Sequence, residues 1–258
     1  MNKMNNIDLD ENKSLFGRNL DETGQHYMID KKLVQFIVDS AELKKNDVVL
    51  EIGYGKGALT KELIKKCHVI AVDIEKNELG LRFKNIEFIH ANILDTIDDL
   101  KFNKIVSNIP YNISEPLMKR LFKKNFEVAV LTVGKDFSKL LTEKNNRIGI
   151  IANHLYNIES LQDVKRDAFF PSPRIKSAVI KIIPKKELNG IELKYRSLVF
   201  LDDKKIKNAV EKIVKDKTKK ELMKLMKNFG HEKIFEKKIY ELSNEEFVEF
   251  DGFLKTLM

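Results

Sequence analysis

The sequence is poor in the residues that form disulfides or hold metal ions. Its 258 residues include one cysteine, Cys67, and five histidines without ligand spacing. A single cysteine excludes internal disulfides and multi-cysteine zinc sites, so we predict a chain without a metal. The sequence also lacks tryptophan, a secretory signal pattern and any apolar run long enough to span a bilayer. We therefore expect a cytoplasmic protein without membrane contact.

Charged residues, in contrast, are abundant. Lys and Arg number 47 against 39 Asp and Glu, which gives a formal net charge of +8. This excess permits phosphate contacts with nucleic acid, although a solvated lysine-rich surface has the same composition. The length predicts one large domain with a small appendage. We place the domains at residues 1–184, where 1–22 form a loose polar arm, and at 185–258, where the pattern is helical and lysine-rich.

Strand-like and helical segments alternate in the first domain, which predicts an α/β fold with a largely parallel sheet. The helix expected after Asp30, a good N-cap, has an apolar face and ends near Ala41. We expect seven strands, the last two forming an antiparallel hairpin at one edge. Their predicted ranges are 47–52, 69–74, 86–90, 105–107, 127–133, 148–155 and 177–183.

A glycine-rich loop follows the first strand and opens a helix. Gly53, Gly55 and Gly57 permit positive φ and let a ligand approach the backbone. Asp73 ends the next strand, at the distance typical of a carboxylate that binds ribose hydroxyls. The spacing Gly53-x-Gly55-x-x-Ala58 also fits the dinucleotide fingerprint, and a tight turn with a capping acid is the structural alternative. The loop therefore indicates a nucleoside cofactor without identifying it.

The fourth strand runs into residues 107–114, SNIPYNIS. Pro110 lacks a backbone donor and forces Ile109 into an extended conformation, so the Ile109 carbonyl should have no ladder partner. Together with the Asn108 amide oxygen it offers two acceptors for the two hydrogens of an exocyclic amine. Tyr111 can stack on the ring that carries this amine. These features suit methyl transfer to an aromatic amine, although an ordinary Asn-Pro loop is the alternative.

The two loops together favour S-adenosylmethionine over a nicotinamide cofactor. No acid or base for hydride transfer follows the fourth strand. The residues 108–111 stand there instead, and they face the same crevice at the carboxyl ends of the strands.

Four motifs in order give the chain a resemblance to a known family. They are residues 23–30, TGQHYMID; 51–57, EIGYGKG; 107–114, SNIPYNIS; and 170–178, FPSPRIKSA. They resemble the motifs of the ribosomal RNA adenine dimethyltransferases (KsgA type), a family that includes the erythromycin-resistance rRNA methylases. The match covers about residues 23–184. It implies a Rossmann-like methyltransferase sheet of seven strands with a small helical C-terminal domain.

The resemblance also implies the site residues. The target adenine would contact Asn108, Ile109, Pro110 and Tyr111, with Phe170 as a second aromatic. S-adenosylmethionine would bind at Gln25, His26, Met28, Gly53, Gly55, Gly57, Asp73, Ile74, Asn92 and Asn108. Asn92 departs from the family, which usually has an Asp there to accept the adenine amine of the cofactor.

The resemblance predicts an enzyme that dimethylates adenosines in small-subunit rRNA, as a monomer acting on an immature ribosomal subunit. Lys204, Lys205 and Lys207 are the expected RNA contacts of the C-terminal domain, although the family usually has Arg-Arg-Lys in this region. Two alternatives stay open from the sequence. One is a non-catalytic assembly factor that keeps the fold, and the other is a paralogue that methylates a different substrate.

Overall fold

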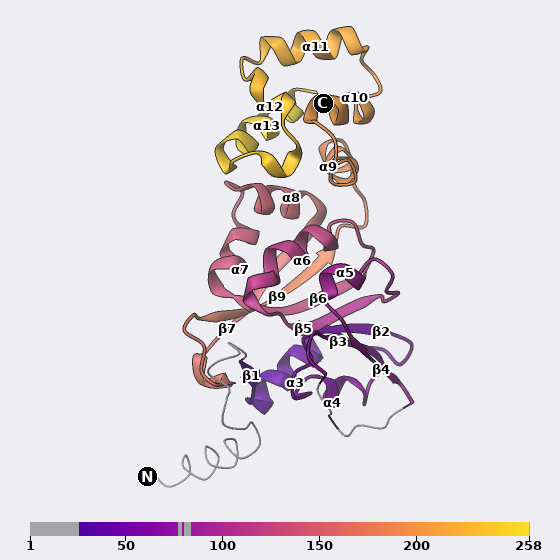
Figure 1. Cartoon of the computed structure of the whole chain (residues 1–258), viewed down its shortest axis with the longest axis vertical. Coiled ribbons are helices and arrows are strands. Elements are labelled where there is room, and N and C mark those ends of the chain that lie inside the picture. The colour runs from indigo at the N-terminus through magenta and orange to yellow at the C-terminus, as the bar shows by residue number, and fades with distance from the viewer. Residues whose placement is uncertain (1–25, 77–78, 80–83, 258) are drawn as a thin grey trace.

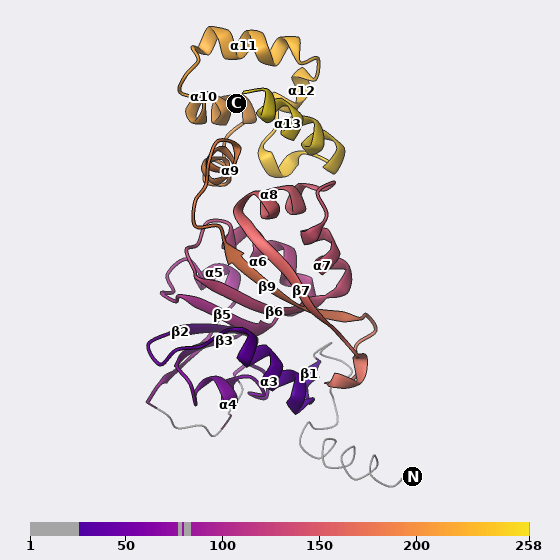
Figure 2. The ribbon, with the colours of Figure 1, turned by 180° about the vertical axis from the view of Figure 1, so that it is seen from behind.

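A computed structural model describes residues 26–76, 79 and 84–257. Figure 1 shows an elongated molecule with a sheet and its flanking helices at one end and a helical region at the other, and Figure 2 shows the same arrangement from behind. No helix in the described part of the chain is long and apolar enough to cross a membrane.

The central sheet has seven strands in the order β4-β3-β2-β5-β6-β9-β7. The first five in this order run parallel, and β9 pairs antiparallel with both β6 and β7. This arrangement agrees with the predicted Rossmann-like sheet and its antiparallel edge. The strands are β2 (Val48–Ile52), β3 (His68–Asp73), β4 (Ile86–His90), β5 (Lys104–Asn108), β6 (Val128–Gly134), β7 (Tyr156–Val164) and β9 (Ser177–Pro184).

Alternating side chains of the inner strands divide the core into two faces. Val49 packs with helices α3 and α4, whereas Leu50 and Ile52 pack with α5 and α6 on the opposite face. The predicted N-cap is confirmed, because Asp30 accepts hydrogen bonds from the first turn of α3. These helices are α3 (Lys31–Ser40), α4 (Thr60–Leu63), α5 (Ile93–Thr96), α6 (Ser114–Leu121) and α7 (Lys135–Thr142), with the 3₁₀ turn η1 (Tyr111–Ile113) before α6.

The predicted strand at 148–155 is wrong, because this segment is the helix α8 (Arg147–Leu155). Its apolar run fits a buried strand and a buried helix equally well. Asn146 caps the helix, and the Arg147 side chain joins it to the C-terminal region by donating to the Tyr240 and Leu242 carbonyl oxygens at 3.0 and 2.6 Å. The seventh strand is instead β7, whose polar residues face solvent at the edge of the sheet.

A separate two-stranded sheet joins the beginning of the described chain to its middle. Strand β1 (Tyr27–Met28) pairs antiparallel with β8 (Phe169–Phe170), which follows the 3₁₀ turn η2 (Arg166–Ala168). Tyr27 lies opposite Phe170 in this pairing. Two of the sequence motifs are thereby brought side by side.

The C-terminal region consists of helices, as predicted, and packs on α8. The apolar core of the α5–α6 face continues through α8 into these helices. A buried polar cluster also joins them: Tyr195 donates to Asp251 at 2.9 Å, and the His154 ring stacks on Tyr195 at 4.3 Å. The elements are α9 (Ile191–Val199), α10 (Ile206–Ile213), α11 (Lys219–Asn228), α12 (Glu232–Glu236), η3 (Ile239–Glu241) and α13 (Asn244–Thr256).

Candidate active site

The glycine loop lies between the ends of β2 and β3. The φ angles of Gly53, Gly55 and Gly57 are 69°, 50° and 76°. Residues other than glycine rarely adopt this backbone conformation. The Gly55 N–H donates to the Asp73 carboxylate at 2.8 Å, and the Glu75 N–H donates to its other oxygen at 3.0 Å. Asp73 therefore fixes the loop, and each of its oxygens retains a lone pair for a ligand hydroxyl.

The loop after β5 touches the glycine loop directly. A Cβ added to Gly53 would lie 3.4 Å from Cδ of Pro110. No backbone N–H of the described residues donates to the Ile109 carbonyl, as the sequence predicted. The two motif loops therefore share one edge of the sheet, at the carboxyl ends of β2, β3 and β5.

Asn108 presents an unused acceptor at this edge. Its Oδ1 is buried and has no hydrogen-bond partner among the described residues, whereas its Nδ2 points to the His26 carbonyl oxygen at 3.5 Å. A buried polar atom without a partner costs about 1–3 kcal/mol. Such a group in a functional loop is best explained as an acceptor whose hydrogen bond is made by a bound ligand.

Tyr111 is held in place by contacts from three segments. Its hydroxyl and that of Ser177, at the start of β9, are 2.6 Å apart, and its ring stacks on that of His26 with centroids 6.4 Å apart. Burial raises the pKa of Tyr111, although the Ser177 hydrogen bond opposes this shift. Close to this ring, a Cβ on Gly134 would lie 3.8 Å from Tyr111 and 3.2 Å from Ile175. The ring orientation is thus fixed without a bound ligand.

His26 and its neighbours connect the first motif to the rest of the site. His26 Nδ1 lies 2.8 Å from the Pro171 carbonyl oxygen. Tyr27 covers the glycine loop, because a Cβ on Gly55 would lie 3.0 Å from its ring. Phe170 comes to this edge through its pairing with Tyr27. Gln25 lies outside the described residues.

The remaining predicted cofactor residues differ in exposure. Met28 is buried in the core and its predicted cofactor contact stays a prediction, whereas Ile74 is 68% exposed directly after Asp73. Asn92 is exposed and caps α5, with its Oδ1 accepting from the Leu94 N–H at 3.1 Å. Ile74 and Asn92 are therefore accessible from solvent at the ends of β3 and β4.

The predicted RNA-contacting lysines do not join this site. Lys204, Lys205 and Lys207 lie at the start of α10, in the region that Figure 1 shows at the opposite end of the molecule from β1. Lys205 and Lys207 both pair with Glu236, at 2.9 and 2.6 Å, and Lys204 pairs with Asp203. Their role in RNA binding stays a prediction.

The sequence analysis missed Glu51 as a functional candidate. This carboxyl is fully buried at the end of β2, and burial raises its pKa to about 8. Its Oε2 has no hydrogen-bond partner among the described residues. A glutamate inside an otherwise apolar strand was the available signal, because buried acids are rare unless they are paired.

Comparison with known proteins identifies the family of this arrangement. Residues 18–250 match the family profile described as ribosomal RNA adenine dimethylase. The chain belongs to the ribosomal RNA adenine dimethylase family. As a member, it is an rRNA adenine methyltransferase, which confirms the reaction and the substrate class predicted from the motifs.

Relatives with similar sequences have the same assignment. A protein of Pyrococcus furiosus named probable ribosomal RNA small subunit methyltransferase A is 34% identical, over 91% of this chain and 92% of its own length. A Methanopyrus kandleri protein of the same name is 37% identical, over 72% of this chain and 74% of its own length. The fold is similar to that of a dimethyladenosine transferase from Plasmodium falciparum, with a TM-score of 0.62, 24% identity and coverage of 87% and 95%.

Proposed function

We propose that this chain dimethylates adenosines of small-subunit rRNA at the exocyclic amine, with S-adenosylmethionine as the methyl donor. The proposal rests on the buried Asn108 oxygen, which has no hydrogen-bond partner among the residues that the structure describes and lies next to a glycine loop with positive φ angles. An acceptor for an amine thus lies beside a loop suited to a nucleoside cofactor. The relatives' names support the small subunit as the source of the rRNA.

The residues present fit S-adenosylmethionine. Gly53 and Gly55 offer backbone without side chains, and Asp73 offers carboxylate lone pairs to ribose hydroxyls. Ile74 and Asn92 are accessible for contact with the adenine of the cofactor. The buried Glu51 carboxyl, at the end of β2, has one oxygen without a hydrogen-bond partner among the described residues. When bound, this cofactor supplies an electrophilic methyl group on a sulfonium.

The adenine to be methylated would be extruded from its stack, at a cost of a few kcal/mol. The Asn108 Oδ1 and the Ile109 carbonyl accept the two amine hydrogens, which localises the nitrogen lone pair. Tyr111, fixed by Ser177, supplies a face on which the base stacks. The amine nitrogen would attack the methyl carbon of the sulfonium, the carbon–sulfur bond would break to release the neutral thioether, and the nitrogen would lose a proton. The chain contributes position instead of a covalent nucleophile.

The substrate context is an immature small subunit, approached by a monomer. The net charge of +8 favours association with RNA. The group formed by Lys205, Lys207 and Glu236 retains one net positive charge, because two lysines share one acid. These lysines can therefore guide RNA through phosphate contacts even though they are ion-paired. A non-catalytic assembly factor is disfavoured, because the amine-holding loop is intact.

The decisive experiment compares Asn108→Ala with Asn157→Ala, an exposed asparagine on β7 that serves as the control. Tritium transfer from labelled S-adenosylmethionine is measured on immature small subunits and on naked rRNA, followed by nucleoside analysis. We expect Asn108→Ala to lower turnover by about a hundredfold or more, because the amine is misplaced, with cofactor binding partly retained. Near wild-type turnover would reject the amine-holding role, and a product other than dimethyladenosine would identify a paralogue.

A further inference from the structure

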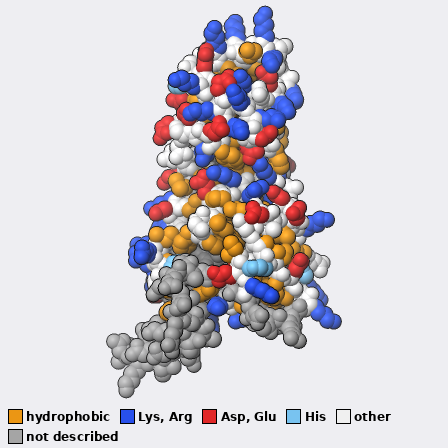
Figure 3. Space-filling model, viewed as in Figure 1, with side chains coloured by type: hydrophobic (Ala, Val, Ile, Leu, Met, Phe, Trp, Pro, Cys, Tyr) orange, Lys and Arg blue, Asp and Glu red, His pale blue; other side chains and the backbone are white. Residues whose placement is uncertain are grey.

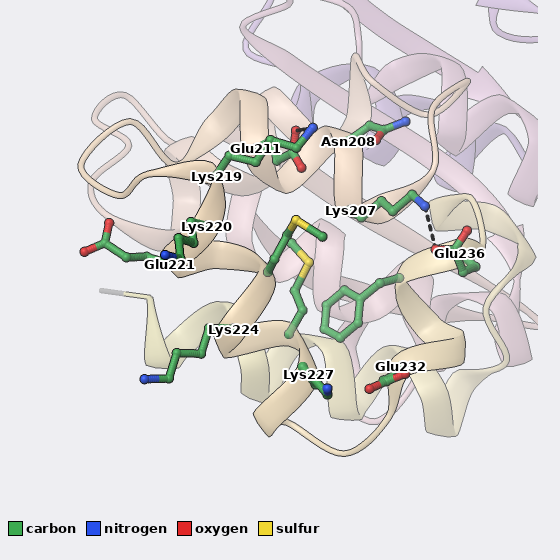
Figure 4. Close-up of a pocket in the computed structure, with 13 residues that line it drawn as sticks. Lys207, Asn208, Glu211, Lys219, Lys220, Glu221, Lys224, Lys227, Glu232 and Glu236 are labelled. Carbon is green, nitrogen blue, oxygen red and sulfur yellow. Dashed lines mark hydrogen bonds and ion pairs between the residues drawn. The ribbon is translucent and has the colours of Figure 1, made fainter.

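A groove with a volume of about 790 Å³ lies among α10, α11 and α12, far from the motif loops (Figure 4). Its apolar lining comes from Met223, Met226 and Phe235. Met226 and Phe235 are buried, whereas Met223 is 58% exposed on α11. Figure 4 shows the sulfur-containing side chains in the middle of the groove, with the charged side chains around its edge.

The charges at the edge are divided unevenly. Lys207 pairs with Glu236 and Lys219 pairs with Glu211. Lys220, Lys224 and Lys227, in contrast, form no ion pair with any residue in the described ranges. Figure 3 shows blue lysine and arginine side chains projecting at this end of the molecule. The α11 edge of the groove therefore carries three lysines that are not ion-paired among the described residues, with Glu221 as its one acid.

These unpaired lysines and the exposed methionine form one stripe. Positions 220, 223, 224 and 227 follow the i, i+3, i+4, i+7 spacing of a single helix face. The helix that carries them is held by a capping box between Thr218 and Glu221. An occupant would thus meet a fixed surface with an apolar centre and a basic flank.

The lining fits a protein segment better than RNA. Single-stranded RNA is bound by aromatic faces, but the Phe235 ring is 3% exposed and packs edge-to-face against Phe229 and Phe253. Four glutamates line the groove together with five lysines, so its field is weak for a phosphate backbone. Methionine side chains, in contrast, adapt to the apolar face of a docked helix.

We propose that this groove is a docking site for an amphipathic helix of a protein partner. The helix places its apolar side chains on Met223 and Met226, and acidic residues on one flank face Lys220, Lys224 and Lys227. This site is separate from the methyl-transfer site, because it lies at the other end of the molecule from β1 and the motif loops.

The test uses the full chain and two stapled helical peptides of about 16 residues, a length at which helices are marginal without a staple. The two share a leucine face and differ in having Glu or Lys on the flank. Binding is measured by anisotropy and by NMR of ¹³C-labelled methionine methyl groups. We expect the Glu peptide to bind and to shift the Met223 and Met226 signals, and the Lys peptide to bind at least tenfold more weakly.

Three variants locate the binding. Met223→Glu and the double variant Lys224→Glu/Lys227→Glu should each weaken the Glu peptide at least tenfold. Leu193→Glu on α9, where the side chain is 52% exposed outside the groove, should bind like the parent. Methylation of naked rRNA should be the same in Met223→Glu and parent. Equal binding of the two peptides, insensitivity to Met223→Glu, or methionine shifts caused by an RNA oligonucleotide alone would each overturn the proposal.

Discussion

The carboxyl edge of the sheet and the C-terminal helices differ in how their polar groups and backbone are arranged. At the sheet edge, Asn108 Oδ1 and Glu51 Oε2 are buried and find no hydrogen-bond partner within the described part of the chain, and three glycines have positive φ. In the C-terminal helices, capping boxes close α11 and α13, and many lysines are ion-paired. Tyr240, at the junction with α8, is an exception, because its buried hydroxyl has no hydrogen-bond partner in the ranges that the structure describes.

At the sheet edge, polar groups gain their hydrogen-bond partners only when a ligand binds. In the C-terminal helices, most polar groups have partners in the folded chain itself. Local strain and unpaired polar groups destabilise the free protein, and they persist where binding uses them. The helices instead satisfy local rules of capping and packing. Four experiments test whether the contrast holds, beginning with the largest expected effect.

One substitution can be made in both regions. Gly55→Val places a β-branched residue at a φ of 50°, with its Cβ 3.0 Å from the Tyr27 ring. A Cβ added at Gly252 on α13, in contrast, has no atom within 4 Å outside its own helix backbone, so Gly252→Val is the control. We expect calorimetry to show that Gly55→Val loses cofactor binding, with about 1–2 kcal/mol of backbone strain, and that Gly252→Val binds normally. Equal cofactor affinity in the two variants would contradict the contrast.

The stability of the ligand-free protein should depend on Glu51. Its pKa of about 8 lies above that of an unfolded glutamate, so the folded state holds this proton more tightly. The free energy of unfolding therefore falls as pH rises from about 4.3, the unfolded value, through the folded pKa. We expect Glu51→Gln to remove this loss and to stabilise the protein by a few kcal/mol above pH 8.

Thermal melts of the parent, Glu51→Gln and Glu87→Gln between pH 5 and 8.5 test this expectation. Glu87 is exposed on β4, so its variant should follow the parent. Parallel curves for all three proteins would show that Glu51 does not carry the predicted penalty.

How far the sequence predicts these two regions depends on the range of the interactions. The strands β2, β3, β5 and β6 are predictable, because their apolar runs are buried on both faces. The segment of α8 was misassigned because long-range contacts hold it, such as the hydrogen bonds from the Arg147 guanidinium to the Tyr240 and Leu242 carbonyl oxygens. Strand β7 was missed because a polar edge strand carries little pattern of its own.

The site shows the same limit. The glycine loop, Asp73 and residues 108–111 are short local motifs, and the structure brings them together at one edge. The contact between Tyr111 and Ser177 joins residues 66 positions apart, and no local pattern reveals it. The burial that raises the pKa of Glu51 is likewise a property of the assembled sheet.

A smaller effect is expected where Ser177 positions Tyr111. Each of Tyr111→Phe and Ser177→Ala removes the same hydrogen bond, worth about 0.5–1.5 kcal/mol. We expect each to lower kcat/KM for RNA by a few-fold, and the double variant to lose little more than either single variant. Ser172→Ala, an exposed hydroxyl near the same strand, is the control. Fully additive losses would show that the two hydroxyls act separately.

The smallest effect concerns Asn92, where the chain departs from its family. Asn92→Asp preserves an N-cap for α5 and adds a charge to the acceptor. We expect cofactor affinity to rise by about 1 kcal/mol, measured by calorimetry. Asp95, three residues further, is the competing acceptor, so Asp95→Asn is measured alongside. Weaker binding in Asp95→Asn with no gain in Asn92→Asp would assign the adenine contact to Asp95.

The hydrogen bond between His26 and the Pro171 carbonyl has a consequence for folding. Its ends are 145 residues apart, and the pairing of Tyr27 with Phe170 closes the same long loop. Contacts of this separation carry a large loop-closure entropy and tend to form late. A nascent chain can therefore assemble most of the parallel sheet before its first motif is anchored. Cofactor-binding competence should appear only after residue 171 has left the ribosome on which the chain is made.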